Sequence, residues 1–246
     1  GELAMGTGTV AGATNNVAVG YKALEDITSA DSNTAIGFLA GTNLTTGGSN
    51  TCVGSEALEA ATTASNTVFI GSRAGEKIPA GLAIEYVTAV GAQAFEGDSS
   101  NTSALTTQTT AIGGKALKSL TTGDGNTAVG YQAGTAITTG QYNTAIGYDS
   151  LKLLTVGESN VSIGYGSMDA MDGTEANNVA IGKDAMGAVD EGSHVSAKAN
   201  GNIAIGKGAL LGGSFSSSDL DLEGNIAIGL NSLDATGANA QTGTIA

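Results

Sequence analysis

A five-residue motif recurs along almost the whole chain and constrains its fold more than any other feature. It reads NVAVG at Asn16–Gly20, NTAIG at Asn33–Gly37 and NTCVG at Asn50–Gly54. Twelve copies are present, and the commonest distance between successive closing glycines is 17 residues. A unit this short has no room for a helix with its loops, but it fits one coil of a β-solenoid. The closing glycines are Gly20, Gly37, Gly54, Gly71, Gly91, Gly113, Gly130, Gly147, Gly164, Gly182, Gly206 and Gly229.

Each motif places β-branched residues at alternate positions and ends on glycine, which predicts a short strand. The twelve motifs contain no charged residue, although 13% of the chain is charged, so both faces of each strand are predicted to be covered. We expect the Val, Ile and Thr side chains to fill the coil and the alanine side to face outward. A second strand of each coil is predicted at Ala-Leu pairs. These pairs include Ala23–Leu24, Ala116–Leu117 and Ala209–Leu210.

The repeats predict an all-β fold, a β-solenoid of about twelve 17-residue coils that forms one domain over residues 16–246. Residues 1–15 precede this domain, and residues 1–5 (GELAM) are interpreted as a cloning remnant. Nine copies of the motif begin with asparagine, and these side chains are expected to stack as an amide ladder at a turn. Coils longer than 17 residues must carry inserted loops. The loops fall near residues 76–86, 95–108, 184–200 and 211–224.

The alanine side of the strands is small and flat, so another backbone surface can approach it closely. Packing against identical chains is the simplest way to cover this side, which predicts a cyclic homo-oligomer. Three chains is the number that we favour, giving a homotrimer. The predicted seam residues are Ala18, Ala35, Ala128, Ala145, Ala180, Ala204 and Ala227.

The charge balance narrows the class of partner. The chain carries 23 acidic and 9 basic residues, a net charge of −14, and has no cluster of Lys or Arg. Phosphate backbones and anionic membrane surfaces attract basic proteins, so neither nucleic acid nor a membrane surface is expected as a partner. No apolar run reaches the roughly 18 residues of a membrane-spanning helix, so membrane insertion is not expected either.

No arrangement of residues predicts catalysis, a cofactor or a metal. Gly201–Gly208 (GNIAIGKG) approaches a phosphate-binding loop but has glycine where a Ser or Thr must follow the lysine. The single Cys52 lies in a buried motif position, and the single histidine, His194, has no second histidine to act with. One acidic insert offers oxygen ligands for calcium, but a solvated loop is the simpler interpretation. This insert contains Asp219, Asp221 and Glu223.

Two features are candidates for recognising a partner. Tyrosine follows the closing glycine in three consecutive coils, where a row of rings either binds the faces of sugars or stabilises the stack of coils. The inserted loops are the second candidate, because loops on a rigid scaffold concentrate binding residues. The candidate receptor-binding residues are Tyr131, Tyr148, Tyr165, His194, Asp219 and Asp221.

Three longer strings carry a resemblance to a known family: NVAVGYKAL (Asn16–Leu24), NTAVGYQAG (Asn126–Gly134) and NTAIGYDSL (Asn143–Leu151). They resemble the NTAIGYQAL-type repeats of bacteriophage tail fibres and are similar to the SVAIG repeats of trimeric autotransporter adhesin heads. The resemblance covers nearly the whole chain and implies a homotrimeric, left-handed parallel β-roll that attaches to a cell surface. The period is longer here than in the adhesin repeats, so the cross-section of the coil is not carried over.

Together these features predict a non-catalytic structural and host-attachment segment of a trimeric fibre. The resemblance implies a virion tail fibre, or an extracellular location at a cell surface, and a host cell-surface receptor such as a glycan. Three alternatives stay open: a bacterial adhesin head, an ice-binding solenoid with exposed Thr-Thr pairs, and a tailspike-type polysaccharide depolymerase. Thermal hysteresis marks the second alternative, and release of reducing ends from host glycans marks the third.

Overall fold

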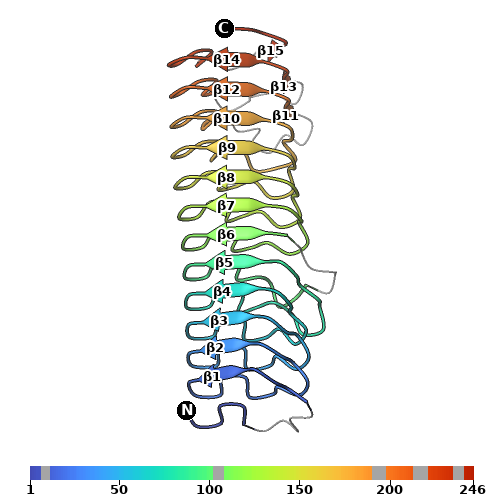
Figure 1. Cartoon of the computed structure of the whole chain (residues 1–246). Helices are drawn as coiled ribbons and strands as arrows, with labels where there is room; N and C mark the ends of the chain where they lie inside the picture. Colours follow the sequence, from blue (N-terminus) through green and yellow to red (C-terminus); the bar gives the residue numbers. More distant parts are fainter. Residues whose placement is uncertain (7–11, 102–107, 190–197, 213–220, 235–240) are drawn as a thin grey trace. The chain divides into compact units, whose positions relative to one another are not determined.

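The computed structural model describes residues 1–6, 12–101, 108–189, 198–212, 221–234 and 241–246. The chain divides into two compact units, Gly1–Gly125 and Asn126–Ala246. Each unit is a stack of coils whose short strands lie one above the other (Figure 1). The described ranges contain no helix, and so no helix among them that could cross a membrane.

Twelve three-residue strands, six in each unit, follow the repeated motif. Within a unit each strand pairs in parallel with the strand of the next coil, and equivalent motif positions are partners, such as Val17 with Thr34 and Thr144 with Val161. This arrangement confirms the predicted all-β solenoid. The first unit contains β1 (Val17–Val19), β2 (Thr34–Ile36), β3 (Thr51–Val53), β4 (Val68–Ile70), β5 (Thr88–Val90) and β6 (Thr110–Ile112). The second unit contains β7 (Thr127–Val129), β8 (Thr144–Ile146), β9 (Val161–Ile163), β10 (Val179–Ile181), β12 (Ile203–Ile205) and β14 (Ile226–Ile228).

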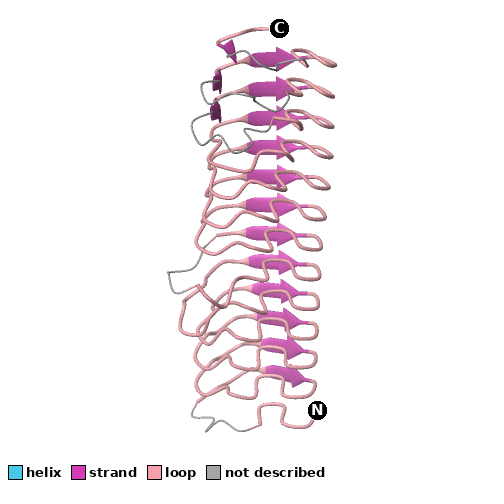
Figure 2. Cartoon of the chain, turned by 180° about the vertical axis from the view of Figure 1, so that it is seen from behind, coloured by secondary structure: helices cyan, strands magenta, loops and turns pink. Residues whose placement is uncertain are grey.

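A second, smaller parallel sheet lies in the second unit and is not predicted by the repeats. It consists of β11 (Lys198–Asn200), β13 (Asp221–Glu223) and β15 (Gln241–Thr242), which Figure 2 shows as three short arrows. β11 and β13 lie at the C-terminal ends of the inserts predicted near residues 184–200 and 211–224. Each of these two inserts therefore ends in a strand, and the two strands pair with each other. Their sequences, KAN and DLE, lack the alternating β-branched residues that identify the main strands.

The segment after each closing glycine is a turn, so the predicted second strand is wrong. In the first coil Lys22 and Leu24 have φ angles of 57° and 51°, and equivalent residues of other coils repeat this left-handed conformation. Such backbone normally costs a non-glycine residue about 1–2 kcal/mol, but hydrogen bonds between coils hold it here. The backbone N–H of Leu24, for instance, donates to the carbonyl of Ala40 over 3.1 Å. An apolar pair in the sequence gives no information on the sign of φ, which explains the error.

Residues 1–5 also fold as part of a coil, so the prediction that the solenoid begins at residue 16 is wrong. Leu3 and Met5 have φ angles of 58° and 53°, close to those of Lys22 and Leu24 in the next coil. The backbone N–H of Met5 donates to the carbonyl of Ala23 over 2.9 Å, as in the contacts between later coils. The string GELAM therefore occupies the same position in its coil as GYKAL in the next coil, and it folds as part of the repeat.

Residues 243–246 (GTIA) extend the main sheet of the second unit in the same way. Ile245 bridges Ile226 in parallel, and the backbone N–H of Ala246 donates to the carbonyl of Ile226 over 2.9 Å. Thr244 stands in the position that asparagine usually occupies. Without that asparagine, the sequence pattern does not identify this copy of the motif.

The alanines of the strands point into the coils, which reverses the predicted orientation. Ala35 and Ala145 are buried, whereas the neighbouring Ile36 and Ile146 are 40% and 36% exposed. Side chains of the turns, such as Ala23 and Leu24, are buried as well and share the interior of the coils with these alanines. The predicted seam is therefore wrong: Ala18 is half-buried, and the other six alanines are buried inside their own chain. Those six are Ala35, Ala128, Ala145, Ala180, Ala204 and Ala227.

The asparagines that begin the motifs form the predicted amide ladder. In the second unit, Asn143 Nδ2 donates to the Oδ1 of Asn126 over 3.2 Å and to the carbonyl of Gly157 over 2.8 Å. Its own Oδ1 accepts the backbone N–H and the Nδ2 of Asn160. Both ends of each amide are thus satisfied inside the protein, which is what a buried polar group requires. The ladder fixes the register of the coils and leaves none of these side-chain atoms of Asn143 for a ligand.

Candidate functional site

The outward side of the main strands, here called the strand face, is the first candidate surface. It consists of the first and third residues of every main strand, which lie on the opposite side from the buried central residue. In the first unit it comprises Val17, Val19, Thr34, Ile36, Thr51, Val53, Val68, Ile70, Thr88, Val90, Thr110 and Ile112. In the second unit it comprises Thr127, Val129, Thr144, Ile146, Val161, Ile163, Val179, Ile181, Ile203, Ile205, Ile226 and Ile228.

The strand face is apolar, regular and solvent-exposed in the single chain. It contains only Val, Ile and Thr, whose branching at Cβ restricts χ1 and makes the surface stiff. In-register pairing places equivalent side chains about 4.8 Å apart from coil to coil. Nine of its residues are exposed, from 36% at Ile146 to 59% at Ile228, and the others are half-buried. Contiguous exposed apolar surface of this kind marks an interaction site in soluble proteins.

A row of three tyrosines, here called the tyrosine ladder, is the second candidate. Tyr131, Tyr148 and Tyr165 follow the closing glycines of three consecutive coils in the second unit. Their ring centroids lie 5.4 Å and 5.3 Å apart, with interplanar angles of 24° and 7°. The stacking that the sequence predicts as one interpretation of this row is therefore present. The rings are 43%, 46% and 55% exposed.

Charged groups flank the tyrosine ladder at one end. The Nζ of Lys183 lies 5.3 Å from the centroid of the Tyr165 ring and forms an ion pair with Asp184. The hydrogen bond that Lys183 donates to the Asp184 carboxylate is the main cause that raises the pKa of Lys183, so this ammonium stays charged at neutral pH. A similar two-ring stack occurs in the first unit, where Tyr21 and Phe38 lie 5.5 Å apart. Phenylalanine is thus compatible with this position of the repeat.

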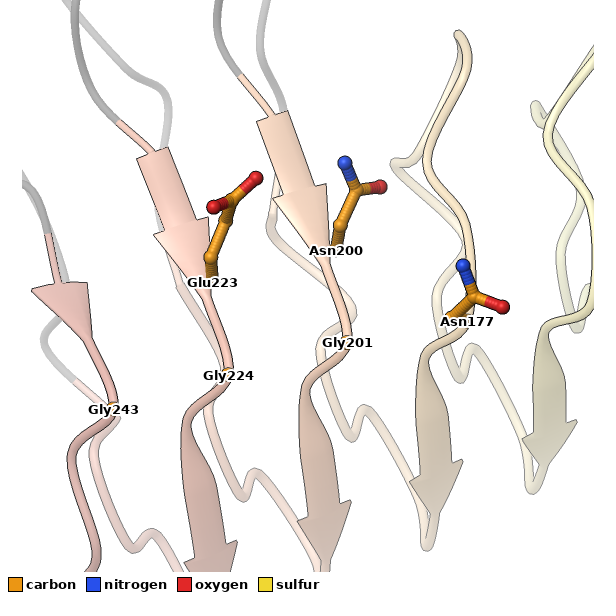
Figure 3. A pocket seen from close by; sticks show the side chains of 6 residues that line it. All are labelled: Asn177, Asn200, Gly201, Glu223, Gly224 and Gly243. Atoms are coloured by element: carbon orange, nitrogen blue, oxygen red, sulfur yellow. The ribbon is translucent and has the colours of Figure 1, made fainter.

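A shallow pocket of about 460 Å³ lies in the second unit at the corner that precedes β12 and β14 (Figure 3). An added Cβ at Gly201 or Gly224 would meet no atom closer than 3.9 Å, so the glycines leave the corner open. The Oδ1 of Asn200 accepts the backbone N–H of Ala176 over 2.7 Å and is already engaged. The sequence does not predict this pocket, because the pocket arises where glycines have no side chain. The lining residues are Asn177, Asn200, Gly201, Glu223, Gly224 and Gly243.

Three carboxylates in the first unit, those of Glu56, Glu59 and Glu76, lie within 4.8 Å of one another. Arg73 already supplies positive charge, because its Nε lies 2.8 Å from Glu56 Oε2 and 3.8 Å from Glu76 Oε2. Burial, followed by the charges of Glu56 and Glu76, raises the pKa of Glu59. The Oε2 of Glu76 is buried and has the Arg73 ion pair but no hydrogen bond. Since a guanidinium occupies the place of a cation, we assign this cluster no metal.

The other residues singled out by the sequence give little further chemistry. Burial raises the pKa of the Cys52 thiol to about 12, so this cysteine is not a nucleophile at neutral pH. The string Gly201–Gly208 is the β12 repeat core, as expected, rather than a phosphate-binding loop. His194 and Asp219 lie outside the described residues, and Asp221 is described only as the first residue of β13. Of the predicted receptor-binding residues, the structure brings together the three tyrosines of the ladder, and nothing in the described residues places the other three beside them.

Comparisons of the chain with protein-family models, with curated protein sequences and with solved structures found no match. The strand face and the tyrosine ladder are therefore the features of the chain from which its function is inferred.

Proposed function

We propose that the chain is a non-catalytic structural segment that assembles with two further copies of itself into a trimeric fibre. The observation that carries this proposal is the strand face, an uncharged, exposed surface that runs through every coil of each unit. In this proposal the strand face forms the seam between chains, in place of the alanine side that the sequence predicts. The seam residues of the proposal are therefore those of the strand face, with Ile146 in the centre of the β7–β9 region.

A second copy of the chain is the partner that fits this surface best. Burial of β-branched side chains stabilises an interface by about 25 cal/mol per Å² of apolar surface. No acidic residue is a member of the strand face, so copies that meet there bring no like charges of this face together. Identical chains carry rows of Val, Ile and Thr side chains with the same spacing, so the rows of two copies can match from coil to coil. A closed cyclic arrangement would cover every copy of the face.

The role of such a fibre, we propose, is attachment to a host cell surface, as part of a virion tail fibre or of an extracellular adhesin head. Support comes from the repeated strings, such as NTAIGYDSL at Asn143–Leu151, and from the stiffness of stacked coils with satisfied hydrogen bonds. Three parallel copies would present each binding residue three times. Once one copy has bound, the other two are held close to the receptor at a high effective concentration, so their weak contacts add to the overall affinity.

Ice binding is the second candidate function, because the strand face is flat and presents threonine in regular rows, including Thr34, Thr51, Thr88 and Thr110. The Thr-Thr pairs that the sequence offers as an ice-binding array favour ice binding less. The Oγ1 of Thr45 and that of Thr138 each donate to a backbone carbonyl of the next coil. Thermal hysteresis in a solution of monomeric chain would favour this function over assembly. The described pocket does not favour the polysaccharide depolymerase, because it contributes one carboxylate, that of Glu223, whereas glycoside hydrolysis uses a pair.

The assembly is tested by sedimentation velocity on the wild-type chain and two variants. Ile146→Glu places a charge in the centre of the strand face, whereas Thr139→Glu places the same charge on an exposed turn. We expect wild type and Thr139→Glu to sediment as trimers, and Ile146→Glu to sediment as a monomer with an unchanged circular dichroism spectrum. A wild-type monomer, or an Ile146→Glu variant that assembles like wild type, contradicts the proposal.

A further inference from the structure

We propose that the tyrosine ladder binds a neutral, extended polysaccharide chain that runs parallel to the axis of the coils. This inference depends on the proposed attachment function, because it names the class of receptor that the fibre would hold. Its starting point is the geometry of Tyr131, Tyr148 and Tyr165, which stack at 5.4 Å and 5.3 Å and stay about half exposed.

The ladder is ordered before any ligand arrives. Each ring is held by its neighbours in the stack, and Tyr165 is held in addition by the Lys183 ammonium at 5.3 Å. Immobilising a free side chain on binding costs about 0.5–1.5 kcal/mol, and this cost is largely absent for rings that are already stacked. A ligand therefore meets three fixed phenol groups, which is the condition for useful affinity from a few weak contacts.

The ladder offers hydroxyl groups and ring edges rather than ring faces. Both faces of Tyr148 are covered, one by Tyr131 and the other by Tyr165, so a sugar cannot stack on the central ring. The described residues provide no hydrogen-bond partner for the three phenol oxygens. Each phenol group can donate one hydrogen bond and accept others. The surface therefore recognises a ligand through a row of hydrogen bonds, one for each coil.

The spacing of the row selects the shape of the ligand. Coils repeat at about 4.8 Å, which is close to the advance of one pyranose in a fully extended β-1,4-linked chain. Such a chain presents hydroxyl groups at every residue along a straight line and can meet all three phenols at once. An α-1,4-linked chain of the same sugar curves away from the line, so it meets one or two phenols at most.

The charge of the protein selects a neutral ligand. With a net charge of −14, the chain repels polyanions over the range of the Debye length. The Lys183 ammonium beside the ladder does not reverse this preference, because Asp184 pairs with it. Apolar ligands are also disfavoured, since what the ladder presents to solvent is a line of hydroxyl groups.

The test is a calorimetric titration of the full chain with two hexasaccharides of glucose, the β-1,4-linked cellohexaose and the α-1,4-linked maltohexaose. The matched variant is Tyr131→Phe/Tyr148→Phe/Tyr165→Phe, which removes the three hydroxyls and keeps the stack, as Phe38 does in the first unit. We expect cellohexaose to bind at least tenfold more tightly than maltohexaose, and the triple variant to lose at least tenfold in affinity for cellohexaose. Single Tyr148→Phe should lose roughly two- to tenfold, the effect of one neutral hydrogen bond.

Failure of cellohexaose to bind, equal binding of maltohexaose, or an unchanged affinity of the triple variant would each overturn the ladder as a polysaccharide site. The proposed assembly has a separate readout, because the triple variant leaves the strand face intact and should sediment like wild type. Loss of binding with unchanged sedimentation therefore supports the ladder. A trimer that binds neither sugar overturns the ladder alone.

Discussion

A Cβ atom added to Gly75 would lie 2.5 Å from the Cε1 of Phe69, inside the same coil. Phe69 occupies the central strand position that alanine holds in most coils, and Gly75 occupies the turn position where the preceding coil has Leu58. The two exceptions compensate each other, because one large and one absent side chain fill the space of Ala plus Leu. The walls of a coil are thus close enough for a single ring to span them.

This packing predicts the result of refilling the turn position. Gly75→Leu should destabilise the chain by about 1–3 kcal/mol through overpacking against Phe69. The double variant Phe69→Ala/Gly75→Leu restores the usual pair and should recover most of that loss. Urea denaturation followed by circular dichroism measures both changes. Equal stability of Gly75→Leu and wild type, or no recovery in the double variant, would show that the two residues do not share one space.

Adjacent residues of one strand should respond in opposite ways to the same charge. Ala145 is buried within its coil, so Ala145→Glu leaves a carboxylate without room or partner and should cost more than about 4 kcal/mol. Ile146→Glu places its carboxylate in solvent in the single chain and should leave the strand folded. Circular dichroism spectra of the two variants distinguish them. If Ala145→Glu keeps the β spectrum while Ile146→Glu loses it, the assigned orientation of the strands is reversed.

The amide ladder predicts a graded series at Asn143. Asn143→Ala removes both ends of the amide and leaves the carbonyl of Gly157 and the backbone N–H of Asn160 without these bonds. One unsatisfied buried group costs about 1–3 kcal/mol. Asn143→Thr should be milder, because Thr67 holds the same position and bonds to Asn50 through its hydroxyl and its backbone N–H. Urea midpoints that rank Ala above Thr would contradict the role assigned to the ladder.

A buried carboxylate in the first unit predicts a dependence of stability on pH. Glu96 is 2% exposed and lies 2.7 Å from the Nζ of Lys77 and 3.1 Å from that of Lys118. Burial opposes its ionisation, but the hydrogen bonds from the two lysines outweigh burial and lower its pKa from the ordinary 4.5. The stability that it contributes is therefore present above pH 4.5 and lost as the pH falls below that value.

Glu96→Gln measures this contribution directly. The variant should be less stable than wild type by about 1–3 kcal/mol at pH 7, the usual range for hydrogen bonds to charged groups. The difference should shrink as the pH falls from 4.5 toward the lowered pKa of Glu96, because wild type then loses its carboxylate as well. A difference that stays constant over this range, measured by urea denaturation, would show that the ionised form is not what stabilises the coil.

The repeat alone predicts where the strands lie but not which way their side chains point. Thr34–Ile36 is a strand as expected, since β-branched residues at alternate positions favour one. Ala35 and Ile36 are both apolar, however, so the pattern is equally consistent with either orientation. The width of the coil decides between them, and this width depends on the turn residues across the coil. The pairing of Phe69 with Gly75 is consistent with a narrow coil, but glycine also holds this turn position in the coils of Ala35 and Ala128, so the sequence pattern alone does not give the width.

The candidate site was predicted in part for a similar reason. Stacking of Tyr131, Tyr148 and Tyr165 follows from equal positions in consecutive coils, and the structure confirms it. The sequence predicts that the residues of the strand face lie in the interior, because the motifs contain no charged residue. An absence of charge is equally typical of a surface that another chain covers. The small sheet of β11, β13 and β15 could not be predicted, because its strands carry no repeated motif.

The molar mass of the wild-type chain in solution tests the central claim most directly, because the proposed trimer would cover the strand face that the single chain leaves exposed. Light scattering coupled to size-exclusion chromatography gives this mass without assumptions about shape. For the proposed trimer we expect a single species of three times the chain mass of 23.9 kDa. A species of 23.9 kDa with an intact β spectrum would contradict it.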